Sequence, residues 1–380
     1  MRIVRVAVLE FYRRLDGRSW NPTMRWHERR APLLVLETDA GLCGVGEAWS
    51  RQPEIALVLD YLAERCASAL VGRDPKAREQ ILAELAALPA PAMPWVAAAA
   101  ASAVDIALWD LAAQANAQPL WRELGGDDGR VPVYASGGLY RDGASAADLV
   151  REFRDHVDQG FTIAKMKIGA LPLDADLGRV RAVRDAVGDR LVLWVDAVNQ
   201  LTRASAPAWC AGLARLGVVA IQAPLPFDDV AGMAALNAGQ LGVVAAEAEH
   251  REEMFVALLE ANAVSHLQYC LGLCGGLSGA MRLDALAAEH HVTSTPQCFS
   301  TAVLQAASLH LGAARENVVA VEFHRFHDHL AAALPSAMRT ITSGCVQLDD
   351  EPGLGVGPPS PGEQPGGGEV RLYRQIVIQH

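Results

Sequence analysis

The 380-residue chain lacks both an excess of positive charge and closely paired cysteines. Its net charge is −11, which disfavours nucleic acid as a partner because phosphate binding needs clustered Lys and Arg. Its seven cysteines are scattered without a Cys-x-x-Cys pair, which indicates reduced thiols in a cytoplasm and neither a disulfide framework nor a zinc site. We therefore expect a cytoplasmic protein that does not bind nucleic acid.

Long apolar runs are also lacking. The longest, around residues 96–104, is rich in alanine and interrupted by Ser102 and Asp105, so it predicts a buried helix and not a membrane span. The first seventeen residues alternate like a strand and have no apolar block of the signal-peptide kind. We expect no membrane partner.

Hydrophobic residues, by contrast, make up 51% of the chain and charged residues 20%, which indicates a globular protein with a large interior. A chain of this length exceeds one ordinary core, so two domains are expected. Pro119 and Gly125-Gly126 close the first part, which places a boundary near residue 130. The first domain, residues 1–130, is predicted to combine strands and helices, at 3–9, 32–38, 53–70, 76–88 and 95–116.

From residue 131 the pattern changes to short apolar runs separated by helical segments. Their spacing of roughly 25–30 residues matches the strand–helix units of a closed parallel barrel, which we predict for residues 131–335. Residues 336–380 begin as a loop rich in proline and glycine and end in a possible strand, so they can return to the first domain. The runs are 131–134, 163–168, 191–195, 218–221, 243–246, 266–270, 291–295 and 318–323.

Two lysines lie at the carboxyl end of the second run, where such barrels carry their active sites. Residues two apart on a strand face the same side, so Lys165 and Lys167 both point inward. Two adjacent cations lower each other's pKa, which favours a neutral amine acting as a base. The alternative is that one lysine points inward and the other extends a solvated ammonium.

Carboxylates end two further runs. Asp196 follows the third and Glu247 the fifth, and together they offer the oxygen ligands that Mg²⁺ prefers. Alternatively, each caps the helix that follows. The corresponding positions on the fourth, sixth, seventh and eighth runs are Gln222, Cys270, Gln297 and Glu322.

These positions belong to a longer series of motifs. Over nearly its whole length the sequence resembles the mandelate racemase branch of the mandelate racemase/muconate lactonizing enzyme family, within the enolase superfamily. The order and spacing of the motifs carry the resemblance: residues 107–111, 119–120, 124–126, 133–138, 165–169, 195–196, 224–225, 275–276, 298–299 and 306–310.

The resemblance implies an α/β fold, with an α+β capping domain completed by the C-terminal segment and a modified TIM barrel, (β/α)₇β. It also implies a homo-oligomer and a Mg²⁺-assisted reaction on a small carboxylate. Such a reaction removes the proton next to the carboxylate, and the metal stabilises the enediolate that results. The loop 16–30, with Trp20 and His27, is where the capping domain would cover the substrate; alternatively it is an ordinary exposed loop.

The first departure from the family pattern concerns the metal site. The metal-ligand positions are Asp196, Gln222 and Glu247, where Gln222 replaces an expected Glu, so Mg²⁺ should bind more weakly. The spacing from Asp196 to Asn199 is also one residue longer than usual, which puts the projection of Asn199 in doubt.

The second departure concerns the face opposite the lysines. Cys270 and Gln297 stand where the branch carries an Asp and a His, and no lysine replaces them on the sixth strand. A racemase that uses two bases is therefore disfavoured. We expect Lys167 to be the base and Lys165 to support the substrate carboxylate. Asn199, Cys270, Gln297 and Glu322 would line the substrate, and Glu322 would hydrogen-bond the enediolate if protonated; otherwise it is a solvated or ion-paired acid.

The function expected from these residues is a Mg²⁺-dependent carbon–oxygen lyase of the acid-sugar dehydratase type. A racemase or epimerase is one alternative. A non-catalytic relative that binds a small acid is the other, because Gln222, Cys270 and Gln297 replace groups that carry charge or protons. A zinc site at His324, His327 and His329 is disfavoured, because only His324 and His327 would share the face of a helix.

Overall fold

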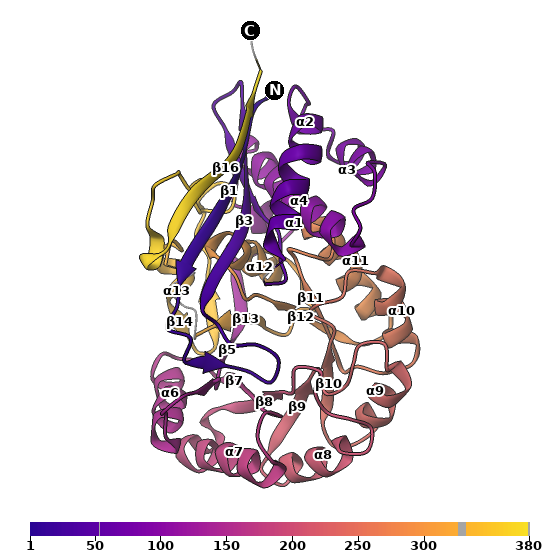
Figure 1. The fold of residues 1–380 in the computed structure, drawn as a ribbon, viewed down its shortest axis with the longest axis vertical. Coiled ribbons are helices and arrows are strands. Elements are labelled where there is room, and N and C mark those ends of the chain that lie inside the picture. Colours follow the sequence, from indigo (N-terminus) through magenta and orange to yellow (C-terminus); the bar gives the residue numbers. More distant parts are fainter. Residues whose placement is uncertain (53, 326–331, 379–380) are drawn as a thin grey trace.

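The computed structural model describes residues 1–52, 54–325 and 332–378 of the chain. Its N-terminal part is built on a four-stranded antiparallel sheet in the order β16-β1-β3-β4 (Figure 1). Alternation places Val6, Val8, Leu34 and Leu36 in the core, where each is fully buried. The strands are β1 (Ile3–Arg14), β3 (Glu28–Thr38), β4 (Cys43–Glu47) and β16 (Glu369–Val377).

Helices cover one face of this sheet. The longest, α4, has the length and composition of a membrane span, but 72% of its most apolar window is buried inside the protein, as expected of a core helix. Gly46 lets it approach β4 closely, since a Cβ at that position would lie 1.9 Å from the carbonyl oxygen of Ala103. The helices are α1 (Ile55–Tyr61), a π-helix (Leu62–Cys66), α2 (Ala67–Leu70), α3 (Arg78–Ala86), α4 (Pro94–Ala115) and α5 (Leu120–Glu123).

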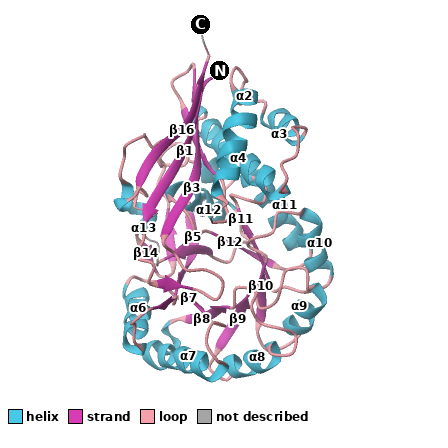
Figure 2. Cartoon of the chain, in the orientation of Figure 1, coloured by secondary structure: helices cyan, strands magenta, loops and turns pink. Residues whose placement is uncertain are grey.

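The second part is a barrel of parallel strands with helices around the outside (Figure 2). Neighbouring strands pair in sequence order from β5 to β12, and β13 returns to pair with β5. A bridge between Ser294 and Val318 joins β12 to the segment that leads into β13. The strands are β5 (Arg130–Gly137), β7 (Ile163–Lys167), β8 (Val192–Asp196), β9 (Val218–Gln222), β10 (Gly242–Ala245), β11 (His266–Cys270), β12 (Thr293–Gln297) and β13 (Val321–His324).

One helix follows each of the first seven barrel strands, so the described span from β5 to β13 has the predicted (β/α)₇β architecture. Helix α6 begins with a capping box, in which Ser145 and Asp148 satisfy each other's backbone N–H groups. The helices are α6 (Ala146–Asp158), α7 (Leu173–Val187), α8 (Ala206–Ala214), α9 (Val230–Asn237), α10 (Glu252–Glu260), α11 (Gly276–Glu289) and α12 (Ala302–Ala314), with a 3₁₀ turn at Gly188–Arg190.

A layer of apolar side chains fills the barrel beneath the site. Tyr134 and Trp194 pack with ring centres 5.2 Å apart, and Trp194 stacks on His266. Ala220, Val244 and Ala320 complete this cluster. The centre of the Tyr134 ring lies 5.6 Å from Lys165 Nζ, so this cluster packs against the lysine at the end of β7.

The end of the chain divides between the two parts. Strands β14 (Ile341–Thr342) and β15 (Cys345–Gln347), preceded by α13 (Ser336–Arg339), extend the barrel sheet at β5. A 3₁₀ turn (Pro365–Gly367) then leads into β16, which pairs with β1. The expected return to the capping sheet is thus made by β16, whereas residues 341–347 belong to the barrel.

Candidate active site

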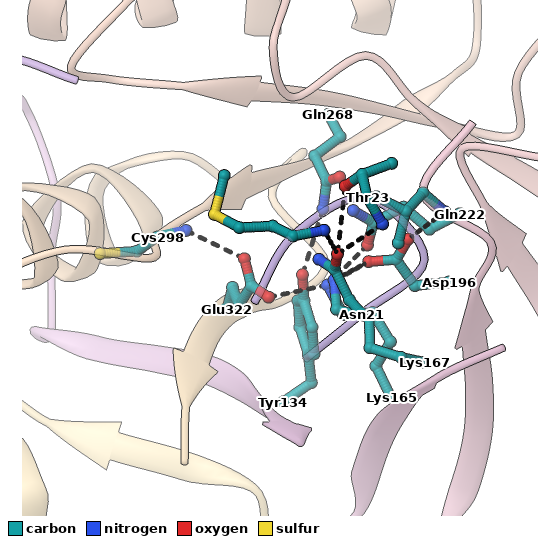
Figure 3. A network of polar contacts seen from close by, with 12 residues as sticks. Asn21, Thr23, Tyr134, Lys165, Lys167, Asp196, Gln222, Gln268, Cys298 and Glu322 are labelled. Atoms are coloured by element: carbon teal, nitrogen blue, oxygen red, sulfur yellow. Dashed lines mark hydrogen bonds and ion pairs between the residues drawn. The ribbon is translucent and has the colours of Figure 1, made fainter. Parts of the chain in front are cut away.

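A network of polar contacts fills the carboxyl ends of β7, β8, β9 and β13 (Figure 3). Lys165 Nζ donates to Gln222 Oε1 and to Glu322 Oε1, each at 2.7 Å, and lies 3.3 Å from Asp196 Oδ2. The Lys165 side chain is only 1% exposed. Parallel strands bring these groups together because their carboxyl ends meet at one end of the barrel.

Lys167 occupies the outer edge of the same network. Its ammonium donates to Asp196 Oδ2, but its side chain keeps 14% exposure, so it is the lysine of the pair that solvent reaches. Asp196 itself is fully buried, and its other oxygen, Oδ1, accepts from the N–H of Val198 at 3.0 Å.

The charges in this network correct one expectation from the sequence. Burial alone would lower the pKa of Lys165, but the carboxylate of Glu322, with Tyr134 and Asp196, outweighs it and raises that pKa well above its ordinary value. Lys165 is therefore held as an ammonium by protein carboxylates. These groups enclose the Lys165 side chain, and its predicted contact with a substrate carboxylate stays a prediction.

Two of the predicted metal ligands end neighbouring strands, since Asp196 of β8 lies opposite Gln222 of β9 in the ladder, and Gln222 lies opposite Val244 of β10. Glu247 follows β10, and its buried Oε2 has no hydrogen-bond partner. Burial, and next the charge of Asp196, raise the pKa of Glu247 to about 7. Over the described residues no three His, Cys, Asp or Glu side chains form a metal-binding group. The set here is two carboxylates and one amide.

This donor set fits a hard divalent cation. Glu247 Oε2 has no hydrogen-bond partner, and burial and the charge of Asp196 disfavour ionisation of Glu247 unless a cation is bound. Carboxylate and amide oxygens are the ligands that Mg²⁺ accepts. For Asp196, burial opposes ionisation, but the ammonium groups of Lys167 and Lys165 outweigh burial and lower its pKa. The lysines thus supply part of the positive charge that these oxygens require.

Glu322 is an ion-paired acid, which was the alternative reading of this residue. Its Oε1 accepts from Lys165, and its Oε2 accepts from the N–H of Cys298 at 3.2 Å. The side chain is 2% exposed. A hydrogen bond from Glu322 to an enediolate would require it to leave these partners, so we assign it to holding Lys165.

Other predicted substrate contacts are also placed differently. Cys270 is completely buried in the hydrophobic core, and burial raises its thiol pKa well above the ordinary value, so it is an inert apolar side chain there. Asn199 donates to the carbonyl oxygen of Leu225 at 2.6 Å and so joins two loops of the barrel. Gln297, 8% exposed with a partnerless Oε1, stays a candidate substrate contact.

The loop between β1 and β3 is attached to the barrel at its base. Strand β2 (Ser19–Trp20) pairs with β6 (Tyr140–Arg141), and the indole of Trp20 stacks on Tyr140 with ring centres 4.7 Å apart. His27 is exposed and lies against Gly17, where an added Cβ would be 2.4 Å from its Nδ1. Trp20 therefore fixes the loop on the barrel, and the predicted contact of Trp20 and His27 with substrate stays a prediction.

The tip of this loop is the part that approaches the site. Asn21 Oδ1 accepts from the N–H groups of Thr23 and Met24, which closes a tight turn. Pro22 reaches the end of β7, since a Cβ on Gly169 would lie 3.9 Å from its Cγ. Figure 3 draws the turn beside the lysine network. Sequence reasoning missed this turn, although the Asn-Pro pair was an available signal.

Two buried residues of the barrel interior were missed as well. Gln268 Nε2 donates to Tyr134 Oη at 3.1 Å, beneath the lysines. Gln268 lies two residues before Cys270 on β11, so the period of two could have found it.

Of the histidines weighed as a zinc site, His324 ends β13 and packs on Phe299, with ring centres 4.2 Å apart. His327 and His329 lie outside the described residues.

Two protein-family models match this chain. Residues 22–125 match the N-terminal domain of mandelate racemase / muconate lactonizing enzyme, and residues 148–360 match the enolase C-terminal domain-like family. The chain belongs to the mandelate racemase/muconate lactonizing enzyme family. The matches cover both parts of the fold and confirm the resemblance seen in the sequence.

The relatives of this chain include sugar-acid dehydratases, cycloisomerases and dipeptide epimerases. The chain is 31% identical to D-galactarolactone cycloisomerase of Agrobacterium fabrum over 369 residues, which is 94% of this chain and 96% of that protein. It is 29% identical to arabinonate dehydratase of Saccharolobus solfataricus, over 68% of this chain and 70% of that one. A racemase from Streptomyces coelicolor A3(2), solved with bound magnesium, superposes with a TM-score of 0.83 at 27% identity, over 93% of this chain and 96% of that one.

Proposed function

We propose that the protein is a Mg²⁺-dependent enzyme that removes the α-proton of a hydroxycarboxylate with Lys167 and then eliminates the β-hydroxyl, as an acid-sugar dehydratase. The observation that carries the proposal is the difference between the two lysines. Lys165 is sealed among carboxylates, whereas Lys167 keeps solvent access beside Asp196. The relatives that are dehydratases of acid sugars support this substrate class.

The residues present divide the work as follows. Asp196, Gln222 and Glu247 would hold Mg²⁺, which supplies positive charge where the substrate carboxylate becomes an enediolate. Lys167 would accept the α-proton at Nζ after it releases the ammonium proton that it donates to Asp196 Oδ2. The β-carbon–oxygen bond then breaks, the hydroxyl takes the proton held by Lys167 and leaves as water, and the enol left behind tautomerises to a 2-keto acid. Lys165 holds Asp196, Gln222 and Glu322 in place throughout.

Elimination is favoured over epimerisation because no second base is found among the described residues at the ends of β11 and β12. Inverting the α-carbon requires a group on the other face that returns the proton. Cys270 is sealed in the core and Gln297 does not titrate, so the corresponding ends of β11 and β12 supply no such group. A single lysine is sufficient for elimination, because the α-proton does not have to be returned to the opposite face.

A second candidate is the isomerisation of a sugar lactone. It is favoured by the match to D-galactarolactone cycloisomerase, which covers nearly the whole of both chains. The first step is the same proton abstraction, but the oxygen that leaves the β-carbon stays in the molecule. The product therefore has the mass of the substrate, whereas dehydration gives a product lighter by one water.

Product analysis separates these functions. The protein is incubated with Mg²⁺ and a panel of aldonates, aldarates and aldarolactones, and the products are weighed by mass spectrometry. We expect a 2-keto product lighter by one water from at least one acid, abolished by Lys167→Met and retained by Lys76→Met, a change at an exposed lysine. An isomer of unchanged mass would support the lactone reaction. Unchanged turnover in Lys167→Met would overturn both candidates.

A further inference from the structure

A buried carboxylate of the capping domain reaches across to a barrel helix. Glu47 is the last residue of β4 and is completely buried. It accepts hydrogen bonds from the hydroxyls of Ser300 and Thr301, from the N–H of Thr301 at 3.2 Å and from the N–H of Leu304 at 3.0 Å. These donors form the start of α12, where a carboxylate satisfies N–H groups that the helix leaves open. Thr301 is the N-cap residue of α12, and Glu47 of the other domain satisfies two further N–H groups there.

The β12–α12 loop, residues 298–301, has a second attachment to the same domain. Arg29 of β3, 6% exposed, donates from Nη2 to the carbonyl oxygen of Phe299 at 2.6 Å. Its guanidinium also lies 4.0 Å from the centre of the Phe299 ring. The loop is therefore held from the capping side on both its backbone and its side chains.

The inner end of this loop contacts the lysine network. The N–H of Cys298 donates to Glu322 Oε2, while Glu322 Oε1 accepts from Lys165 at 2.7 Å. From α12 itself, Gln305 Nε2 donates to the backbone carbonyl of Glu322 at 3.0 Å. An unbroken series of contacts thus runs from Glu47, through the loop, to Glu322 and Lys165 (Figure 3 shows its inner part).

We propose that Glu47 is a positioning residue of the active site, which holds the β12–α12 loop so that Cys298 N–H fixes Glu322 against Lys165. The inference extends the proposed function and names a role for the capping domain besides covering substrate. Losing Glu47 would let the loop move, and the Glu322 carboxylate would then lose the hydrogen bond from Cys298 N–H, which is one of its two partners. Lys165 would then shift relative to Asp196, and with it the base, Lys167.

The chain offers a matched control. Asp105, on α4 of the capping domain, is also fully buried and accepts from the N–H and hydroxyl of Ser278, at 2.9 and 2.6 Å, near the start of α11. It therefore ties the capping domain to a barrel helix as Glu47 does. Ser278, however, lies in a helix for which no contact to the lysine network is found among the described residues.

The first test needs no substrate. Residue-resolved amide hydrogen exchange is measured in the full-length protein and in Glu47→Gln and Asp105→Asn. In Glu47→Gln we expect faster exchange at Thr301, at Leu304 and also at Cys298, by about tenfold or more. In Asp105→Asn the increase should be confined to the start of α11. If Cys298 keeps its protection while Thr301 and Leu304 lose theirs, Glu47 only caps a helix and the proposal is wrong.

The second test uses an acid that the product assay identifies. We expect kcat of Glu47→Gln to fall on the order of tenfold or more, with a smaller change in KM, because small displacements of reacting groups are costly. Its pH profile should shift as that of Glu322→Gln does, and the double variant should be no worse than Glu322→Gln. Asp105→Asn should keep the wild-type profile. Additive effects of Glu47→Gln and Glu322→Gln would overturn the proposal.

The two tests separate this inference from the proposed function. If the wild type acts on no acid sugar but Cys298 loses protection in Glu47→Gln, the series of contacts stands and the assigned reaction is wrong. If the reaction is found but the exchange at Cys298 is unchanged, the proposed function stands and the role of Glu47 is wrong.

Discussion

Replacement of Lys165 by Met should destabilise the protein far more than replacement of Lys167. Lys165 is 1% exposed and is the ammonium partner of Glu322, which would then keep only the N–H of Cys298 beside its carboxylate. Removing one partner of a buried ion pair costs about 3–5 kcal/mol of unfolding free energy. In Lys167→Met, Asp196 still has Lys165 and the N–H of Val198, so we expect a cost of about 1–2 kcal/mol.

Urea unfolding followed by tryptophan fluorescence measures this difference. The chain has three lysines, and exposed Lys76 provides the control, for which we expect a change within about 0.5 kcal/mol. Adding Glu322→Gln to Lys165→Met should recover part of the loss, since no unpaired charge then remains on that side of the network. Equal costs for Lys165→Met and Lys167→Met, at unchanged m-values, would refute the ion-paired arrangement.

Three further predictions concern the metal, pH and the loop. Titration calorimetry should show Mg²⁺ affinity falling about tenfold or more in Glu247→Gln; unchanged affinity would remove this carboxylate from the ligand set. Burial lowers the pKa of His310 from its ordinary value of 6.5 to about 4. Between these two pH values the unfolded chain is protonated at His310 and the folded protein is not, so the protein loses stability as the pH falls. Urea unfolding at pH 8 and pH 5 should show a change in unfolding free energy that differs by about 2 kcal/mol between the wild type and His310→Gln, whereas an equal change in both would contradict the assignment. Asp142→Ala removes the partner of Arg25 and of the Trp20 indole, so steady-state kinetics should show a raised KM with little change in kcat, and an unchanged KM would separate the loop from substrate binding.

Residue periodicity favoured a closed barrel, and the family resemblance supplied its (β/α)₇β form. Short apolar runs at regular spacing located its strands, and the period of two placed Lys165 and Lys167 on one face. The register then brings Asp196 and Gln222 to the same level from the next two strands. These features depend on local pattern and on a symmetric architecture, so the sequence alone carries them.

The roles within the network depended on contacts that a local pattern does not encode. The carboxylate that fixes Lys165 as an ammonium is Glu322, 157 residues away in the chain. Without that contact, two adjacent lysines suggest mutual lowering of their pKa values, and the opposite holds for Lys165. The partnerless oxygen of Glu247 and the depth of Cys270 likewise follow from packing.

The role of the loop at residues 16–30 was harder to predict for a different reason. Its aromatic residues suggest contact with a substrate, but Trp20 anchors the loop on Tyr140. The tip is formed by Asn21 and its turn, which a search for aromatic or titratable groups passes over. Side-chain direction in an irregular segment is set by its anchor points, here Arg25 and Asp142, which come from different parts of the chain.

The central claim is that Lys167 removes the α-proton of a metal-bound acid, and hydrogen exchange into substrate tests it most directly. Acid sugars are incubated in D₂O with Mg²⁺, and deuterium at the α-carbon and in the products is measured by NMR for the wild type, Lys167→Met and Lys76→Met. The account predicts Mg²⁺-dependent exchange or turnover in the wild type and in Lys76→Met, and none in Lys167→Met. Exchange that continues at the wild-type rate without Lys167 would contradict it.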